Sequence, residues 1–158
     1  METIQDIHKD FKGYNAYPIK EAEKIVRSRI AERLSALVTK VHDCVEKAKK
    51  EGRIKELSEI LTVYRRMERL KKEINERDMV FVPAYLKERI TKVDDEKLRG
   101  IDIRVAEIIN AIDETIEQIS CDKTDMYVVK KFVAIETYIH EMEQKCHERA
   151  NALKKDSL

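Results

Sequence analysis

The sequence predicts an all-α fold, an up-down-up-down four-helix bundle of long amphipathic helices with one short inserted helix. The 158 residues include only three glycines and two prolines, the residue types that most often interrupt helices. Charged residues make up 40% of the chain and apolar residues 42%, a balance typical of helical bundles and coiled coils. In four long runs the apolar residues lie three or four positions apart, which places each set on one helical face.

Residues 1–17 are predicted to be a lead-in before a single helical bundle domain, residues 18–158. The lead-in has the spacing of a short helix followed by an aromatic turn, with Ile4, Ile7 and Phe11 and then Tyr14 and Tyr17. Pro18 opens the first long helix, because the missing N–H of proline costs nothing at the first helical position. The apolar stripe that begins at Ile19 runs on to Lys50, and Gly52 ends the helix.

The second helix follows at once and is predicted to reach about Asp78. Its expected stripe consists of Ile54, Leu57, Leu61, Tyr64, Met67, Leu70 and Ile74. Because the connection at Gly52 is so short, the first two helices must run antiparallel as a hairpin.

An apolar run interrupts the helical pattern at residues 79–86. Pro83 disfavours a helical conformation at the residue before it, so we expect Val80–Val82 to be extended. The short inserted helix is expected from Pro83 to about Thr91.

The third long helix is expected to start at a cap formed by Asp94 or Asp95. It carries the most regular stripe, which consists of Leu98, Ile101, Val105, Ile108, Ile112, Ile116 and Ile119. Gly100 near its start is expected to allow close packing or a bend. After a turn at residues 120–124, the last helix has a stripe of Val128, Phe132, Ile135, Ile139, Met142, Cys146 and Leu153.

The net charge of +1 gives no bulk attraction to nucleic acid or anionic lipid. The charge is nevertheless uneven. Residues 18–78 hold 17 Lys and Arg against 12 Asp and Glu, whereas residues 79–122 hold 6 against 10. We interpret this as two halves that lie side by side and neutralise each other.

The cysteine pattern and the chain start predict the compartment. Cys44, Cys121 and Cys146 have no close spacing, so neither a disulfide framework nor a zinc signature is expected. The first residues lack the basic and apolar regions of a secretory signal, and no stretch has the ~20 apolar residues that span a bilayer. We therefore expect a soluble, cytoplasmic protein.

Catalysis has little support in the sequence. There is no glycine-rich phosphate loop and no dinucleotide-binding fingerprint. Cys121 could be activated by the dipole of the last helix, but no histidine is near it in sequence. Cys44 follows His42 closely but lies on the apolar stripe, which indicates a core residue. We expect no enzyme activity, no cofactor and no small-molecule substrate.

A row on the last helix is the strongest candidate for a metal site. Glu136, His140, Glu143 and His147 are spaced by four, three and four residues, so all four share one helical face. Carboxylates and imidazoles in such a row can bind zinc or iron. The order differs from the Glu-x-x-His of di-iron bundles, and only Glu107 and Glu114 could contribute from another helix.

Nucleic acid is a possible ligand of the second helix. Arg65, Arg66, Arg69, Lys71 and Lys72 could place several cations along one helix, as phosphate binding requires. The alternative is an ordinary solvated helix surface that nearby glutamates neutralise. A second basic patch lies at the first hairpin, around Lys47 and Arg53.

Two aromatic or apolar connectors are candidate docking patches. One is the lead-in, and the other is the run that contains Val80, Phe81, Val82, Tyr85 and Leu86. Each either folds over an end of the bundle as a lid or stays exposed, in which case it marks an interface.

These observations favour a non-enzymatic helical interaction or assembly module, either an oligomer or a small subunit of a larger complex. The first alternative is an accessory subunit of a nucleic-acid-processing complex of the replication or defence type, and the second is a metal-binding bundle. The stretch Leu57–Glu88 resembles the helical domain of archaeal GINS replication proteins, without their following β domain. In size and class the chain is similar to small helical subunits of CRISPR effector complexes. Neither resemblance includes a motif that transfers a site residue.

Overall fold

The all-α prediction is confirmed in the computed structural model, which describes residues 7–76, 94–121 and 125–155. The described residues form four long helices and no strand. The helices are α1 (Ile19–Lys50), α2 (Ile54–Glu76), α4 (Asp95–Cys121) and α5 (Asp125–Lys155), and the short 3-10 helix η2 (Tyr14–Ala16) precedes them. The expected inserted helix at residues 83–91 lies outside the described residues.

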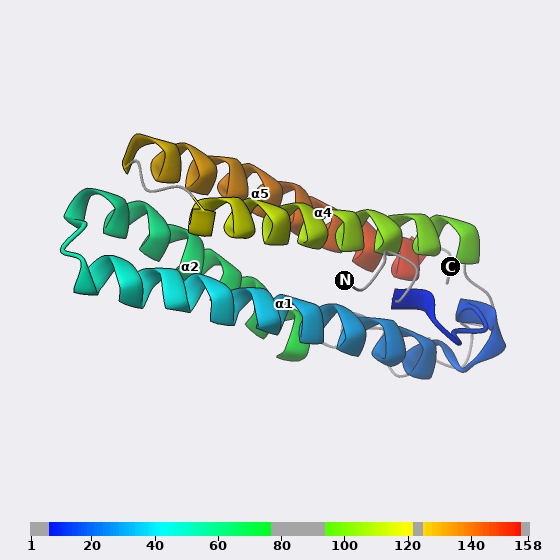
Figure 1. The fold of residues 1–158 in the computed structure, drawn as a ribbon. Helices are drawn as coiled ribbons and strands as arrows, with labels where there is room; N and C mark the ends of the chain where they lie inside the picture. Colours follow the sequence, from blue (N-terminus) through cyan, green and yellow to red (C-terminus); the bar gives the residue numbers. More distant parts are fainter. Residues whose placement is uncertain (1–6, 77–93, 122–124, 156–158) are drawn as a thin grey trace.

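Two helical hairpins lie face to face along one long axis (Figure 1). The α1–α2 hairpin is the lower one in that view and the α4–α5 hairpin the upper one, and the colours show that the two helices of each hairpin run in opposite directions. Between the hairpins, α1 packs against α4 and α2 packs against α5. The 32 residues of α1 span about 48 Å, most of the length of the bundle.

The helix ends follow local sequence signals. Gly52 has a φ of 66°, the left-handed conformation that glycine adopts without steric cost. This turn lets the backbone N–H of Arg53 donate to the carbonyl of Ala48 at 3.0 Å, which closes the end of α1. At the start of α4, Asp94 Oδ1 accepts the backbone N–H of Lys97 at 3.1 Å, so Asp94 is the cap.

The predicted stripes of α1, α4 and α5 form most of the core. All seven stripe residues of α4 are buried, and so are the stripe residues of α5 from Val128 to Met142. Gly100 has open space where a β-carbon would stand, so the expectation of close packing at this glycine is wrong. No described helix combines the length and the apolar composition that a bilayer-spanning segment requires.

The buried face of α2 differs from the predicted one. Ile54, expected to begin the stripe, is 80% exposed, and Leu57, Leu61 and Tyr64 are only partly buried. The buried face instead consists of Glu56, Ile60, Val63, Met67, Leu70 and Ile74. In the first half of α2, both the predicted and the observed set of residues have helical spacing. The observed set includes the charged Glu56, so a pattern of apolar residues does not identify it as the buried face.

Opposite charges link the two hairpins along their edges. Lys40 of α1 donates to Asp113 of α4 at 2.5 Å and to Glu117 at 3.1 Å. The hydrogen bond to Asp113, more than any other effect, raises the pKa of Lys40. On the other edge, Arg66 of α2 lies 3.4 Å from Glu143 of α5. The Lys40 contacts are of the kind expected if the basic first half neutralises the acidic segment that follows.

The lead-in folds back over one end of the bundle, beside the start of α1 (Figure 1). We call residues 7–17 the N-terminal lid. The Phe11 ring is edge-on to Tyr14, with 5.1 Å between centroids, and stacks on Tyr17 at 5.6 Å. The Arg99 guanidinium of α4 lies 5.3 Å from the Phe11 ring centroid, a cation–π contact. Of the two predicted roles for the lead-in, the structure therefore favours the lid.

Candidate functional site

Three charged side chains are buried at the end of the bundle that the N-terminal lid covers. Arg149 of α5, Asp102 of α4 and Glu23 of α1 are each at most 1% exposed. Arg149 Nε donates to Asp102 Oδ1 at 2.8 Å, and Arg149 Nη1 donates to Glu23 Oε1 at 3.0 Å. Arg27 lies 3.3 Å from the other Glu23 oxygen. Charge-assisted hydrogen bonds thus connect three helices at this end.

Two residues of the lid join this buried cluster. The Tyr14 hydroxyl donates to Asp102 Oδ2 and accepts from Arg149 Nη2 at 3.2 Å. His8 Nε2 lies 3.2 Å from the same Asp102 oxygen. The backbone N–H of Tyr14 also donates to Asp95 Oδ1 at 2.7 Å. The lid is therefore held by polar contacts as well as by its aromatic rings.

Burial and neighbouring charges shift the pKa of two members of the cluster, Tyr14 and Arg149. Burial raises the pKa of the Tyr14 hydroxyl, so Tyr14 keeps the proton that it donates to Asp102. For Arg149, burial alone would lower the pKa, but Tyr14, Asp102 and Glu23 outweigh this effect and raise it. The cluster thus consists of a permanent cation held between two carboxylates, and its hydrogen-bonding groups are directed at one another. The hydrogen bonds of the cluster thereby join α1, α4 and α5 at this end of the bundle.

Sequence reasoning missed this cluster, although one signal was present. Arg149 lies three residues after Cys146 and four before Leu153, which places a charged residue on the apolar stripe of α5. Asp102 and Glu23 each lie one position from a stripe residue and look like ordinary helix surface. Only the folded chain brings all three together, from positions as far as 126 residues apart.

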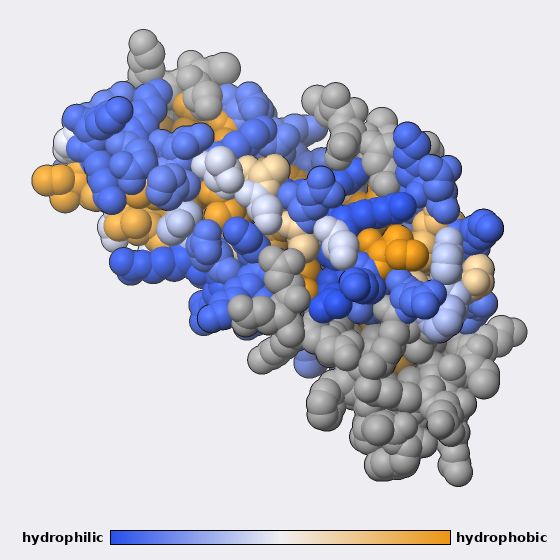
Figure 2. Space-filling model, turned by 90° about the horizontal axis from the view of Figure 1, so that it is seen from below, coloured by the Kyte–Doolittle hydropathy of each residue, from blue (hydrophilic) through white to orange (hydrophobic). Residues whose placement is uncertain are grey.

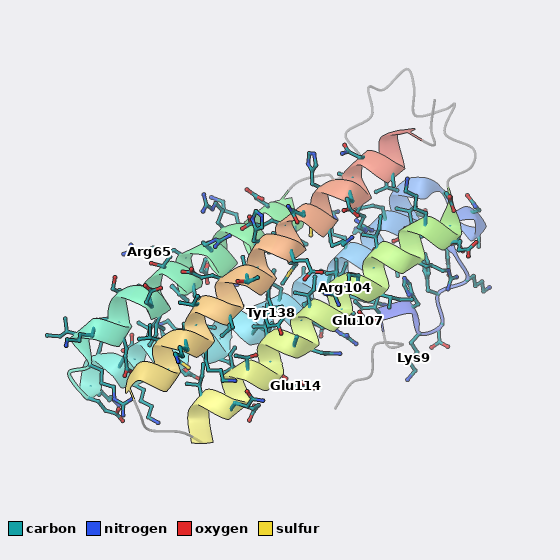
Figure 3. The ribbon with its side chains drawn as sticks, turned by 90° about the horizontal axis from the view of Figure 1, so that it is seen from above. Lys9, Arg65, Arg104, Glu107, Glu114 and Tyr138 are labelled. Carbon is teal, nitrogen blue, oxygen red and sulfur yellow. The ribbon has the colours of Figure 1, made fainter. Side chains whose placement is uncertain are left out.

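The predicted basic residues of α2 divide into two groups. Arg65, Arg69 and Lys72 are exposed, whereas Arg66 and Lys71 are partly buried. Figure 3 shows Arg65 directed away from the bundle. We call the three exposed residues the α2 ridge. Spacings of four and three place them in one line along the helix.

The predicted metal row on α5 lies beside α2. Glu143 contacts Arg66, so the structure brings together two candidate sites that the sequence treats separately. His140 and His147 are exposed, and Glu136 is partly buried. Among the residues that the structure describes, no three His, Cys, Asp or Glu side chains form a group that could hold a metal ion. The row is therefore not assembled as a ligand set.

The two α4 glutamates that could have completed this row are not part of it. Glu107 pairs with Arg104 on its own helix at 3.0 Å. Arg104 also pairs with Glu141 of α5 at 2.6 Å, so these charges link α4 to α5. Figure 3 shows Glu107 and Glu114 on α4, and Glu114 is exposed.

The described thiols have the environment of structural cysteines. Burial raises the pKa of Cys44, and Asp43 raises it further. Burial likewise raises the pKa of Cys146 to about 11. Both are free thiols that pack against the core. Since the thiolate is the nucleophile, these environments disfavour nucleophilic chemistry at either residue. This agrees with the interpretation of Cys44 as a core residue.

The opposite end of the bundle carries an exposed isoleucine, and the residue that precedes it in sequence, Arg53, lines a pocket. We call this end, where α1 turns into α2, the tip. Ile54 is the most exposed of the three large apolar side chains that stand in solvent among the described residues; the others are Ile103 and Val133. This pocket has a volume of about 200 Å³ and an apolar floor of Ile60, Ile119, Val128 and Phe132. The charged residues that line it are Lys47, Glu51 and Arg53 at its rim and the buried Glu56.

The rest of the visible surface is mainly hydrophilic. Figure 2, which views the molecule from below, shows hydrophilic residues over most of the described surface, with small separate apolar areas between them. The predicted docking patch of Val80, Phe81, Val82, Tyr85 and Leu86 lies outside the described residues. Comparison of the chain with protein-family models, curated proteins and solved structures found no match.

Proposed function

We propose that the protein is a non-enzymatic, cytoplasmic helical assembly module that associates with a second copy of itself through the tip. The observation that carries this proposal is the exposure of Ile54, an isoleucine that is 80% exposed and follows Arg53, a residue that lines a pocket with an apolar floor. Exposed apolar groups next to a concave site are typical of interfaces. The free thiols Cys44 and Cys146 fit the reducing cytosol that the cysteine pattern predicts.

The features of the tip favour a second copy of this chain as the partner that binds there. Ile54 and the pocket lie at the same end of the molecule, so a twofold axis through the tip lets each Ile54 enter the pocket of the other copy. The pocket rim carries both signs of charge, with Lys47 and Arg53 near Glu51. Each copy thus supplies both cations and carboxylates for ion pairs with the other copy. Burial of each isoleucine contributes about 1.5–3 kcal/mol.

Light scattering at increasing protein concentration tests this proposal. We expect the wild-type chain to associate and Ile54→Asp to remain monomeric, because the change removes the apolar side chain and a carboxylate is costly to take out of water. The matched control is Val133→Asp, which places the same charge on another exposed apolar residue, 47% exposed on α5. Circular dichroism shows whether each variant keeps its helices.

A third variant separates the tip from the patch that the sequence predicts. Phe81→Asp lies in that patch, and it should leave association unchanged if the tip is the interface. If Phe81→Asp loses association and Ile54→Asp does not, the interface is the Val80–Leu86 segment and not the tip. A wild-type chain that stays monomeric at all concentrations contradicts self-association altogether.

A further inference from the structure

The α2 ridge presents three cations in one exposed line. Lys72 lies seven positions after Arg65, with Arg69 between them, which is about 10 Å along the helix axis. Within the described parts of the chain, none of the three forms an ion pair with a carboxylate. Figure 3 shows that Arg65 points outward into solvent. The ridge therefore differs from the other edge of the bundle, where Lys40 is paired twice.

The acidic side chains nearest to the ridge are partly engaged elsewhere. Glu143 contacts Arg66, and Glu68 accepts a hydrogen bond from Tyr64. The shallow groove between α2 and α5, lined by Arg69, Leu70, Glu73 and Glu143, holds both signs of charge. Arg69 of the ridge therefore borders this groove, whereas Arg65 and Lys72 do not line it.

We propose that the α2 ridge binds the phosphate backbone of nucleic acid without reading its base sequence. Arginine donates to phosphate oxygens in a bidentate geometry, and lysine adds a mobile point charge. Three cations in line match an extended chain of phosphates, and the convex outer face of one helix offers no base-reading pocket. This site is separate from the tip, so the proposals of phosphate binding and of self-association can be tested independently.

Fluorescence anisotropy with a short fluorescein-labelled DNA duplex of mixed sequence tests the ridge. If three phosphates are neutralised, the slope of log K against log salt is about −2.7, which is a loss of about 40-fold between roughly 50 and 200 mM salt. Each single change, such as Arg65→Gln, should reduce the slope by about 0.9. The triple variant Arg65→Gln, Arg69→Gln and Lys72→Gln should lose measurable binding.

The matched control carries the same change of charge away from the ridge. Lys9, Lys24 and Lys97 are exposed outside α2, and their triple change to Gln should leave both affinity and slope as in the wild type. Equal weakening in the two triple variants, or no binding by the wild type at low salt, overturns the proposal. So does competition by polyglutamate as strong as that by unlabelled duplex at equal charge, because the ridge would then not distinguish phosphate from carboxylate.

Discussion

At the scale of single residues, Arg149 determines how one end of the bundle is organised. It is the only residue whose side chain reaches α1, α4 and the N-terminal lid among the described contacts. A buried ion pair adds little net stability over an apolar replacement, because removing two charges from water is costly. The Arg149 guanidinium, however, makes all of its hydrogen bonds only when Glu23, Asp102 and Tyr14 occupy their observed positions. We infer that the cluster selects the alignment of the helices rather than strengthening the core.

Removal of Arg149 should therefore be far more damaging than removal of a surface cation. Arg149→Ala leaves Asp102 and Glu23 buried without their counter-charge, and we expect a loss of about 3–5 kcal/mol in the free energy of unfolding. Urea denaturation measures this loss. The control is Lys145→Ala, which breaks the solvent-accessible pair with Glu148 and should cost no more than about 0.5 kcal/mol. Equal losses in the two variants would show that the buried cluster has no special role.

The thiol of Cys146 should make stability depend on pH in the alkaline range. Burial raises its pKa from 9.0 to about 11, so below pH 9 the folded and unfolded chains are both protonated. Between pH 9 and 11 only the unfolded chain loses this proton, which favours unfolding. The contribution of this thiol therefore falls by about 1.4 kcal/mol per pH unit across that window.

Chemical denaturation of wild type and Cys146→Ala at several pH values isolates this contribution. The difference in the free energy of unfolding between the two proteins should be constant below pH 9 and should change steadily above it. A difference that stays constant up to pH 11 would mean that Cys146 ionises as easily in the folded chain as in the unfolded chain.

At the scale of the elements, helix boundaries were predictable and the orientation of α2 was not. Pro18, Gly52 and Asp94 act on the backbone within a few residues, so the sequence alone places α1 and the start of α4 to within a residue. The rotation of α2 depends on which of two overlapping stripes meets α1 and α5. Burial of Glu56 beside the tip pocket is a tertiary effect, and a pattern of apolar residues carries no signal for it.

The two exposed glycines of the helical hairpins should respond oppositely to alanine. At Gly52 the φ of 66° is strained for a residue with a β-carbon, so Gly52→Ala should lower the free energy of unfolding by about 1–2 kcal/mol. At Gly100 a β-carbon meets open space inside α4, so Gly100→Ala should raise it by about 0.5–1 kcal/mol. Thermal unfolding of both variants checks the two signs. Destabilisation by Gly100→Ala would mean that the helix needs the bend that the sequence allows there.

At the scale of the whole molecule, the two ends of the bundle have different characters. One end is closed by the N-terminal lid over the Arg149 cluster, and the other presents Ile54 and its pocket. The sequence predicts the helical bundle and most of its core, because these depend on periodicity along each helix. It does not predict the cluster, the pocket or the contact between Arg66 and Glu143, because each joins residues that are distant in sequence.

The central claim, that two copies meet through their tips, is tested most directly by spin-label distances between copies. In a chain whose native cysteines are replaced by alanine, one label is placed at Lys50→Cys by the tip and, separately, one at Lys97→Cys near the lid end. The account predicts a short distance between Lys50→Cys labels and no measurable one between Lys97→Cys labels, which two bundle lengths would separate by roughly 90 Å. A short distance at Lys97→Cys, or none at either position, would contradict it.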